Sequence, residues 1–106
     1  MNINLVECPE ILQEEVKKYL SGHSDGKIIC ITKYECTPYK DKTVILTTYT
    51  IGVQEHNYFT TFVYMVPSNT SYLSLGVIKN SMNAGEIIDI IANAEDGYFD
   101  GLKARA

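Results

Sequence analysis

Residues 43–66 read TVILTTYTIGVQEHNYFTTFVYMV. Two runs rich in β-branched and aromatic residues, 43–53 and 58–66, flank the short polar segment 54–57. Runs of this composition favour strands. A connection this short joins antiparallel neighbours, because parallel neighbours need a long crossover. The stretch therefore predicts two adjacent antiparallel strands at the centre of the chain.

Strand-like segments continue on both sides of this pair. Residues 27–36 carry apolar side chains on both alternating phases, as an interior strand does. Residues 71–79 predict a further strand, although Gly76 interrupts it. The turn-forming segments 37–42 and 67–70 separate these strands from the central pair. The sequence thus predicts four antiparallel strands in succession.

One helix is expected on each side of the strand block. Apolar residues recur at helical spacing from Ile11 to Leu20, and Ser21-Gly22 follows as a stop signal. After the strands, residues 83–86 resemble a capping box, and an isoleucine-rich segment with helical period runs on to Gly97. Both segments are predicted to be helices.

The predicted order is α-β-β-β-β-α, which contains no alternating βαβ units. We therefore expect an α+β fold with a four-stranded antiparallel sheet and two helices packed on one face. The length of 106 residues suits one domain. We expect a single domain over 1–106, with a tail that is partly irregular from about residue 98.

Composition points to a cytoplasmic protein. No apolar run approaches the ~20 residues that cross a bilayer, and the first residues lack the features of a signal peptide. Cys30 and Cys36 lie about 20 Å apart on one predicted strand, too far for a disulfide, which fits a reducing compartment. Cys8, near a helix start, is a candidate nucleophile because its pKa could be lowered there, but no base accompanies it.

Charge is distributed unevenly. Residues 1–26 and 80–106 each carry a net charge of −3, whereas residues 27–79 carry +2, and the whole chain carries −4. This acidity argues against nucleic-acid binding. The acidic residues of the last predicted helix are either a solvated face or a complement to a basic partner. They are Glu86, Asp89, Glu95 and Asp96.

Tyrosines recur on one alternating phase of the predicted strands, together with threonines. They are Tyr34, Tyr49, Tyr58, Tyr64 and Tyr72. Because the opposite phase is apolar enough to pack on helices, we expect the tyrosine phase to be the free face of the sheet. That face is either a solvated surface of residues with high β-propensity or a contact surface for a partner. A bulge near Gly52 would divide it into two patches.

These observations predict a small, non-enzymatic protein-binding module. We find no catalytic motif, metal-ligand cluster or cofactor motif, and the neighbours His23, Ser24 and Asp25 lack the usual spacing of a triad. The small acidic chain and its excess of Lys, Ile and Asn, which is typical of AT-rich genomes, favour an accessory or inhibitor protein of phage or mobile-element type that acts on a larger partner. The alternatives are single-stranded nucleic-acid binding on the tyrosines, a toxin-neutralising immunity protein, and homodimerisation through the sheet. No membrane partner is expected.

Overall fold

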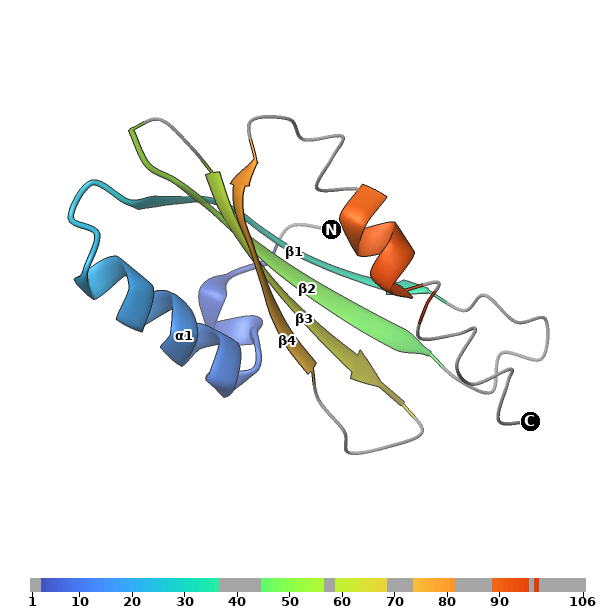
Figure 1. Ribbon diagram of the computed structural model, residues 1–106. Coiled ribbons are helices and arrows are strands. Elements are labelled where there is room, and N and C mark those ends of the chain that lie inside the picture. Colours follow the sequence, from blue (N-terminus) through green and yellow to red (C-terminus); the bar gives the residue numbers. More distant parts are fainter. Residues whose placement is uncertain are drawn as a thin grey trace.

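The computed structural model describes residues 3–36, 45–56, 59–68, 74–81, 89–95 and 97. Its elements are the 3-10 helix η1 (Leu5–Glu7), the helix α1 (Glu10–Ser21) and the strands β1 (Lys27–Cys36), β2 (Leu46–Gln54), β3 (Phe59–Pro67) and β4 (Ser74–Ser81). Residues 89–95 form a further helix (Figure 1). The predicted α+β class and the antiparallel pairing are confirmed. The predicted start of the last helix and the tail from residue 98 lie outside the described residues.

The sheet is a meander. Its strands lie in the order β1-β2-β3-β4, and each pairs with its sequence neighbour in the antiparallel sense. β1 spans the residues predicted for it. β3 begins at Phe59 and ends at Pro67, one residue later at each end than the run of β-formers suggested. Proline is tolerated at this end because Pro67 is the last residue of the strand.

One face of the sheet packs against α1. Leu12 and Val16 lie one turn apart on the helix and are both fully buried. They form the main core together with Ile51, Val53 and Phe62. Burial of each such side chain contributes about 1.5–3 kcal/mol, so this layer supplies much of the stability. Gly22 follows the last residue of α1 and caps the helix, because its N–H donates to the Tyr19 carbonyl at 3.1 Å.

The segment before α1 follows the outer side of β1. The backbone N–H of Ile3 donates to the carbonyl of Ile31 at 3.0 Å, so the beginning of the described chain is tied to this edge strand. η1 then carries the chain to Cys8, which is 5% exposed in the core beneath α1. The N-terminal segment is therefore part of the packed structure.

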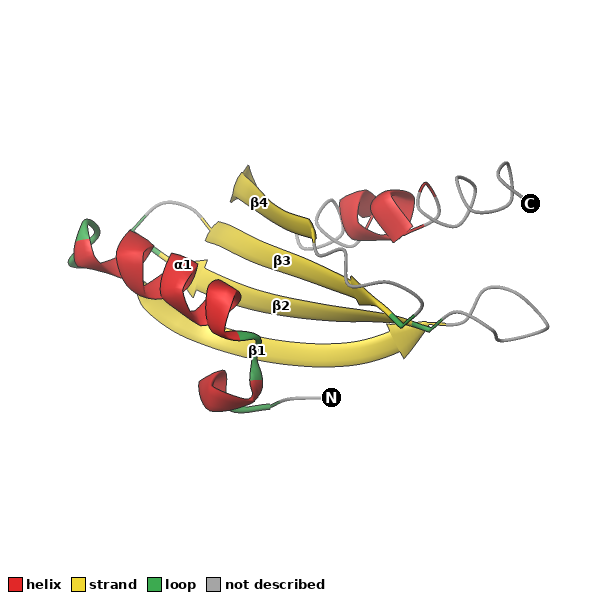
Figure 2. Ribbon diagram, turned by 90° about the horizontal axis from the view of Figure 1, so that it is seen from below, coloured by secondary structure: helices red, strands yellow, loops and turns green. Residues whose placement is uncertain are grey.

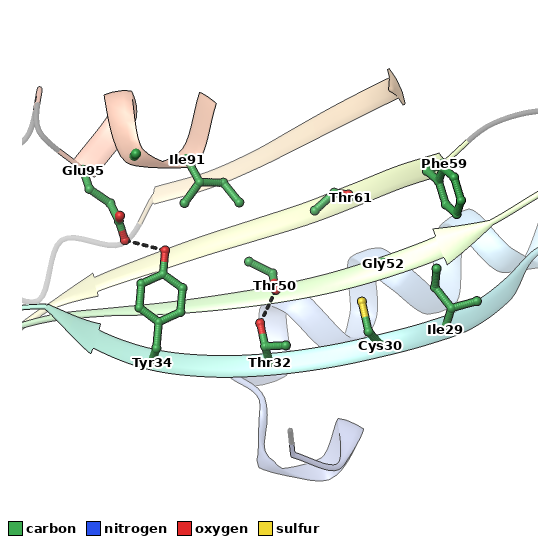
Figure 3. A pocket seen from close by; sticks show the side chains of 11 residues that line it. Ile29, Cys30, Thr32, Tyr34, Thr50, Gly52, Phe59, Thr61, Ile91 and Glu95 are labelled. Carbon is green, nitrogen blue, oxygen red and sulfur yellow. Dashed lines mark hydrogen bonds between the residues drawn. The ribbon is translucent and has the colours of Figure 1, made fainter. Parts of the chain in front are cut away.

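The helix of residues 89–95 covers the other face of the sheet (Figures 2 and 3). The prediction that both helices pack on one face is wrong. Glu95 of this helix accepts a hydrogen bond from Thr48. Thr48 lies on the second face of the sheet, whereas Tyr49 and Ile51 lie on the face that packs against α1. That second face also carries apolar side chains, Leu46 and Val63, both buried. Since each face has apolar surface to bury, one helix on each side satisfies both.

Within the part of the chain that the structure describes, every helix is too short or too polar to cross a membrane.

Candidate binding groove

A β-bulge in β1 decides which side chains reach the second face. The register pairs Ile28 with Val53, but the next pair is Cys30 with Gly52, so Ile29 is an extra residue. An inserted residue moves every later side chain of a strand to the opposite face. Without it, Tyr34 would lie across from Thr47, on the same face as Tyr49. With it, Tyr34 lies across from Thr48.

The predicted tyrosine face is therefore divided. Tyr34 lies on the face covered by residues 89–95, whereas Tyr49 and Tyr64 pair with each other on the face of α1. Tyr64 is 1% exposed and belongs to the core. Tyr58 and Tyr72 lie outside the described residues. The expectation of one free tyrosine face is thus wrong for the three tyrosines that can be placed.

The second face contains a cavity of about 680 Å³ between the sheet and residues 89–95 (Figure 3). β1, β2 and β3 supply its floor and the helix supplies one wall. The lining residues are Ile29, Cys30, Thr32, Tyr34, Thr50, Gly52, Phe59, Thr61, Ile91, Ala92 and Glu95. Ile29 is 51% exposed and Tyr34 36% exposed, so the cavity opens to solvent along β1. We call it the groove.

Gly52 makes room for the groove floor. A Cβ atom at this position would lie 2.8 Å from the Cys30 sulfur on the neighbouring strand, closer than such atoms approach. The glycine therefore permits β1 and β2 to keep a thiol on the groove face, directly after the bulge. Cys30 is exposed there.

Four hydroxyl groups in and beside the groove are bonded to one another or to the wall. Thr32 and Thr50 share a hydrogen bond across β1 and β2. Tyr34 Oη donates to Glu95 Oε2 at 2.8 Å, and Thr48 Oγ1 donates to the same oxygen at 2.7 Å. Because these polar groups are bonded within the protein, the surface offered to a ligand is mainly apolar.

The helical wall is fixed by two residues spaced one turn apart. Ile91 is buried against the sheet, with 8% exposure, and Glu95 reaches β1 and β2 through the two hydroxyls. Residues four apart lie on the same side of a helix. Ala92 lines the groove beside Ile91, and its small side chain leaves the cavity open.

Two of the sequence-predicted site residues meet in this groove, Tyr34 and Glu95. Asp89 lies on the same helix and is exposed, outside the groove lining. Glu86 and Asp96 lie outside the described residues. Sequence reasoning missed Thr48 and Ile91, which fix the wall. The isoleucine periodicity indicated Ile91 as a packing residue, but no sequence signal related Thr48 to Glu95.

Cys8 does not have the environment of a nucleophile. Burial raises the pKa of the Cys8 thiol, and the neighbouring Glu7 charge raises it further. The expectation that the helix start lowers its pKa is therefore wrong, because burial and the Glu7 charge both disfavour the thiolate. Cys8 acts as a small core side chain.

Comparison of the chain with protein-family models, with curated proteins and with solved structures gives no match.

Proposed function

We propose that this chain is a non-enzymatic protein-binding module, an accessory or inhibitor protein that binds an apolar segment of a larger partner in the groove. The observation that carries the proposal is the groove itself. It is open, the hydroxyls of Thr32, Tyr34 and Thr50 in its lining are bonded within the protein, and its lining exposes Ile29 and Tyr34. Partly exposed apolar and aromatic side chains around a concavity are typical of protein-binding sites.

The chemistry of the rim favours a partner that is not strongly acidic. Asp89 is exposed on the helical wall, and the chain carries a net charge of −4. Like charges brought together at an interface cost several kcal/mol, which selects against an acidic partner. The alternative of nucleic-acid stacking loses support, because Tyr64 is buried and Tyr34 lies on the other face from Tyr49.

A pair of tryptophan substitutions on the helical wall tests the proposal. Ala92→Trp places a large side chain into the groove, whereas Ala94→Trp adds the same side chain at an exposed position outside the lining. The tagged chain and both variants are used to capture partners from a lysate of the encoding organism. We expect the wild type and Ala94→Trp to retain the same partner and Ala92→Trp to lose it.

Retention of the partner by a folded Ala92→Trp variant would show that the groove is not the binding surface. Circular dichroism establishes that each variant is folded. Tyr34→Ala and Tyr49→Ala give a second comparison on the two faces of the sheet. The first should weaken capture and the second should not.

The volume of the groove favours a second candidate function, the binding of a small apolar molecule. About 680 Å³ lies within the range of small-ligand sites, roughly 300–1,000 Å³. A fluorescent apolar probe such as anilinonaphthalene sulfonate should then bind with one-to-one stoichiometry. Ala92→Trp should abolish that binding, and Ala94→Trp should not. Failure of the wild type to bind the probe would contradict this candidate. It would not affect the protein-binding proposal, which the capture experiment tests.

A further inference from the structure

One hydroxyl in the lining of the groove differs from the others. Thr61 lies on β3, in the floor of the groove, and is only 7% exposed (Figure 3). The lining hydroxyls of Thr32, Thr50 and Tyr34 are bonded within the protein. The Thr61 hydroxyl makes no hydrogen bond to any residue that the structure describes. Its partner is therefore an atom that enters the groove from outside the protein.

Thr61 faces a thiol across a glycine. The register pairs Cys30 with Gly52 and Gly52 with Thr61, so the three residues form one row across β1, β2 and β3. Side chains of directly paired residues lie on the same face of a sheet, which here is the groove face. The Cα atoms of Cys30 and Thr61 are two strand spacings apart, roughly 10 Å. Because Gly52 has no side chain, the row leaves a slot between the thiol and the hydroxyl.

The slot suits an uncharged oxygen. The groove lining in the described part of the chain contains no Lys, Arg or His, and its one carboxyl group belongs to Glu95. A carboxylate that entered the slot would lose its hydration without gaining an opposite charge, which is unfavourable. A neutral carbonyl oxygen needs only a hydrogen-bond donor, and a threonine hydroxyl supplies one.

The rest of the lining suits an apolar body around that oxygen. Ile29, Phe59 and Ile91 lie around the row of Cys30, Gly52 and Thr61 and contribute apolar surface (Figure 3). Small-molecule sites typically combine such a lining with a few polar groups that fix the orientation of the ligand. The groove has this composition, with the Thr61 hydroxyl as the polar group that is open to a ligand.

We propose that the groove binds a neutral apolar molecule that carries a carbonyl group, such as a ketone or an ester, and that the carbonyl oxygen accepts a hydrogen bond from the Thr61 hydroxyl. Thr61 determines the specificity for this class of ligand, and the apolar lining buries the remainder of the molecule. The proposal rests on the second candidate function, small-molecule binding in the groove, and adds the chemical class of the ligand.

Two probes of similar shape test the proposal. Acetylnaphthalene carries a carbonyl group, and ethylnaphthalene has a methylene group in its place. Isothermal titration calorimetry measures the affinity of the full chain and of Thr61→Val for each probe. We expect Thr61→Val to bind acetylnaphthalene about fivefold more weakly than the wild type, the usual contribution of one neutral hydrogen bond. Its affinity for ethylnaphthalene should not fall, because valine keeps the shape of threonine and adds no polar group.

Two control variants separate the hydroxyl of Thr61 from a general effect of substitution. Thr61→Ser keeps a hydroxyl at this position and should keep the affinity for acetylnaphthalene. Thr60→Val makes the same exchange one residue earlier, outside the groove lining, and should leave both affinities unchanged. Circular dichroism establishes that each variant is folded, and Thr61→Ala takes the place of Thr61→Val if that variant unfolds.

The exposed thiol reports where the probe binds. In a Cys36→Ser variant, acetylnaphthalene should slow the alkylation of Cys30 by iodoacetamide in proportion to its occupancy, because Cys30 lines the groove. The alkylation of Cys8, which is buried in the core on the other side of the sheet, should not change. Binding of the probe without protection of Cys30 would place it elsewhere and would overturn the proposal.

The remaining outcomes distinguish this proposal from the candidate function on which it rests. If Thr61→Val binds both probes as the wild type does, or loses affinity for both equally, the proposal is wrong but small-molecule binding in the groove stands. If the wild type binds neither probe, both are contradicted. Capture of a protein partner by the wild type is a separate result and supports neither.

Discussion

Tyr34 and Glu95 are joined by a hydrogen bond of 2.8 Å, although 61 positions separate them in the sequence. The bond links the edge strand β1 to the helix of residues 89–95 and closes one end of the groove. Thr48 donates to the same carboxylate oxygen from the central strand β2. Besides the packing of Ile91, the position of the helical wall therefore depends on Glu95, whose side chain is bonded to two strands.

We expect Tyr34→Phe to destabilise the fold by about 1 kcal/mol, the usual contribution of such a bond, and Glu95→Ala to destabilise it further, because Glu95 also accepts from Thr48. Because both substitutions remove the bond between Tyr34 and Glu95, the double variant should lose less than the sum of the two single losses. Urea denaturation of the wild type and the three variants measures the coupling. Strictly additive losses would show that the bond does not stabilise the fold.

Gly52→Ala should destabilise the fold by about 1–3 kcal/mol, the usual cost of inserting a methyl group into a packed site. The reason is the approach of its Cβ to the Cys30 sulfur, 2.8 Å. Cys30→Ala in the same chain removes the sulfur and should recover most of the loss. Gly22→Ala is the matched control, since a Cβ atom there would lie 3.8 Å from the Tyr19 carbonyl oxygen, an ordinary contact distance. A Gly52→Ala variant as stable as Gly22→Ala would contradict the close contact.

Tyr64→Phe should stabilise the fold by about 1 kcal/mol near neutral pH. The Tyr64 hydroxyl is buried, and it has no hydrogen-bond partner among the residues that the structure describes. Phenylalanine keeps the ring in the core and removes this unpaired polar group. Thermal or urea denaturation measures the change, and a clear loss of stability would show that the hydroxyl is bonded in solution.

The advantage of Tyr64→Phe should grow at alkaline pH. Burial raises the pKa of Tyr64 above its ordinary value near 10, whereas the unfolded chain ionises at that ordinary value. The wild type therefore keeps its full stability below about pH 10 and loses part of it as pH rises towards the folded-state pKa. Phenylalanine has no such loss. Denaturation curves at about pH 9 and pH 10.5 test this, and an unchanged difference would contradict it.

Cys30 should react with iodoacetamide at least about tenfold faster than Cys8 in the folded protein. Cys30 is exposed in the groove, whereas Cys8 is buried and its pKa is raised, so less of it is thiolate at a given pH. Alkylation of a Cys36→Ser variant followed by mass spectrometry compares the two sites. The difference should disappear in urea. Comparable rates in the folded protein would mean that Cys8 is accessible.

Much of the secondary structure could be predicted from local pattern. The span of β1 and the approximate spans of α1, β2 and β3 follow from the alternation of apolar residues, the helical period before Gly22 and the turn-forming segments. These signals are local, because period and composition are properties of neighbouring residues. The existence of a helix in the isoleucine-rich segment followed from the same kind of signal.

The faces of the sheet could not be predicted in the same way. Whether Tyr34 lies beside Tyr49 depends on one extra residue at Ile29, and nothing in the apolar run 28–31 indicates which residue is the extra one. The face of the sheet on which the helix of residues 89–95 packs likewise depends on long-range contacts of Ile91 and Glu95. The contact between His23 Nδ1 and Glu55 Oε2 likewise joins residues 32 positions apart, and nothing in the sequence around either residue indicated it.

The hydrogen bond from Ile3 to Ile31 bears on how the molecule behaves at high concentration. An edge strand offers unpaired backbone groups to any other strand that approaches, and this is a route to polymeric aggregates. β1 is such a strand, and the Ile3 N–H already occupies the Ile31 carbonyl near its middle. The contact of Ile3 thus protects part of this edge from self-association, and a variant that lacks Ile3 should aggregate more readily than the wild type.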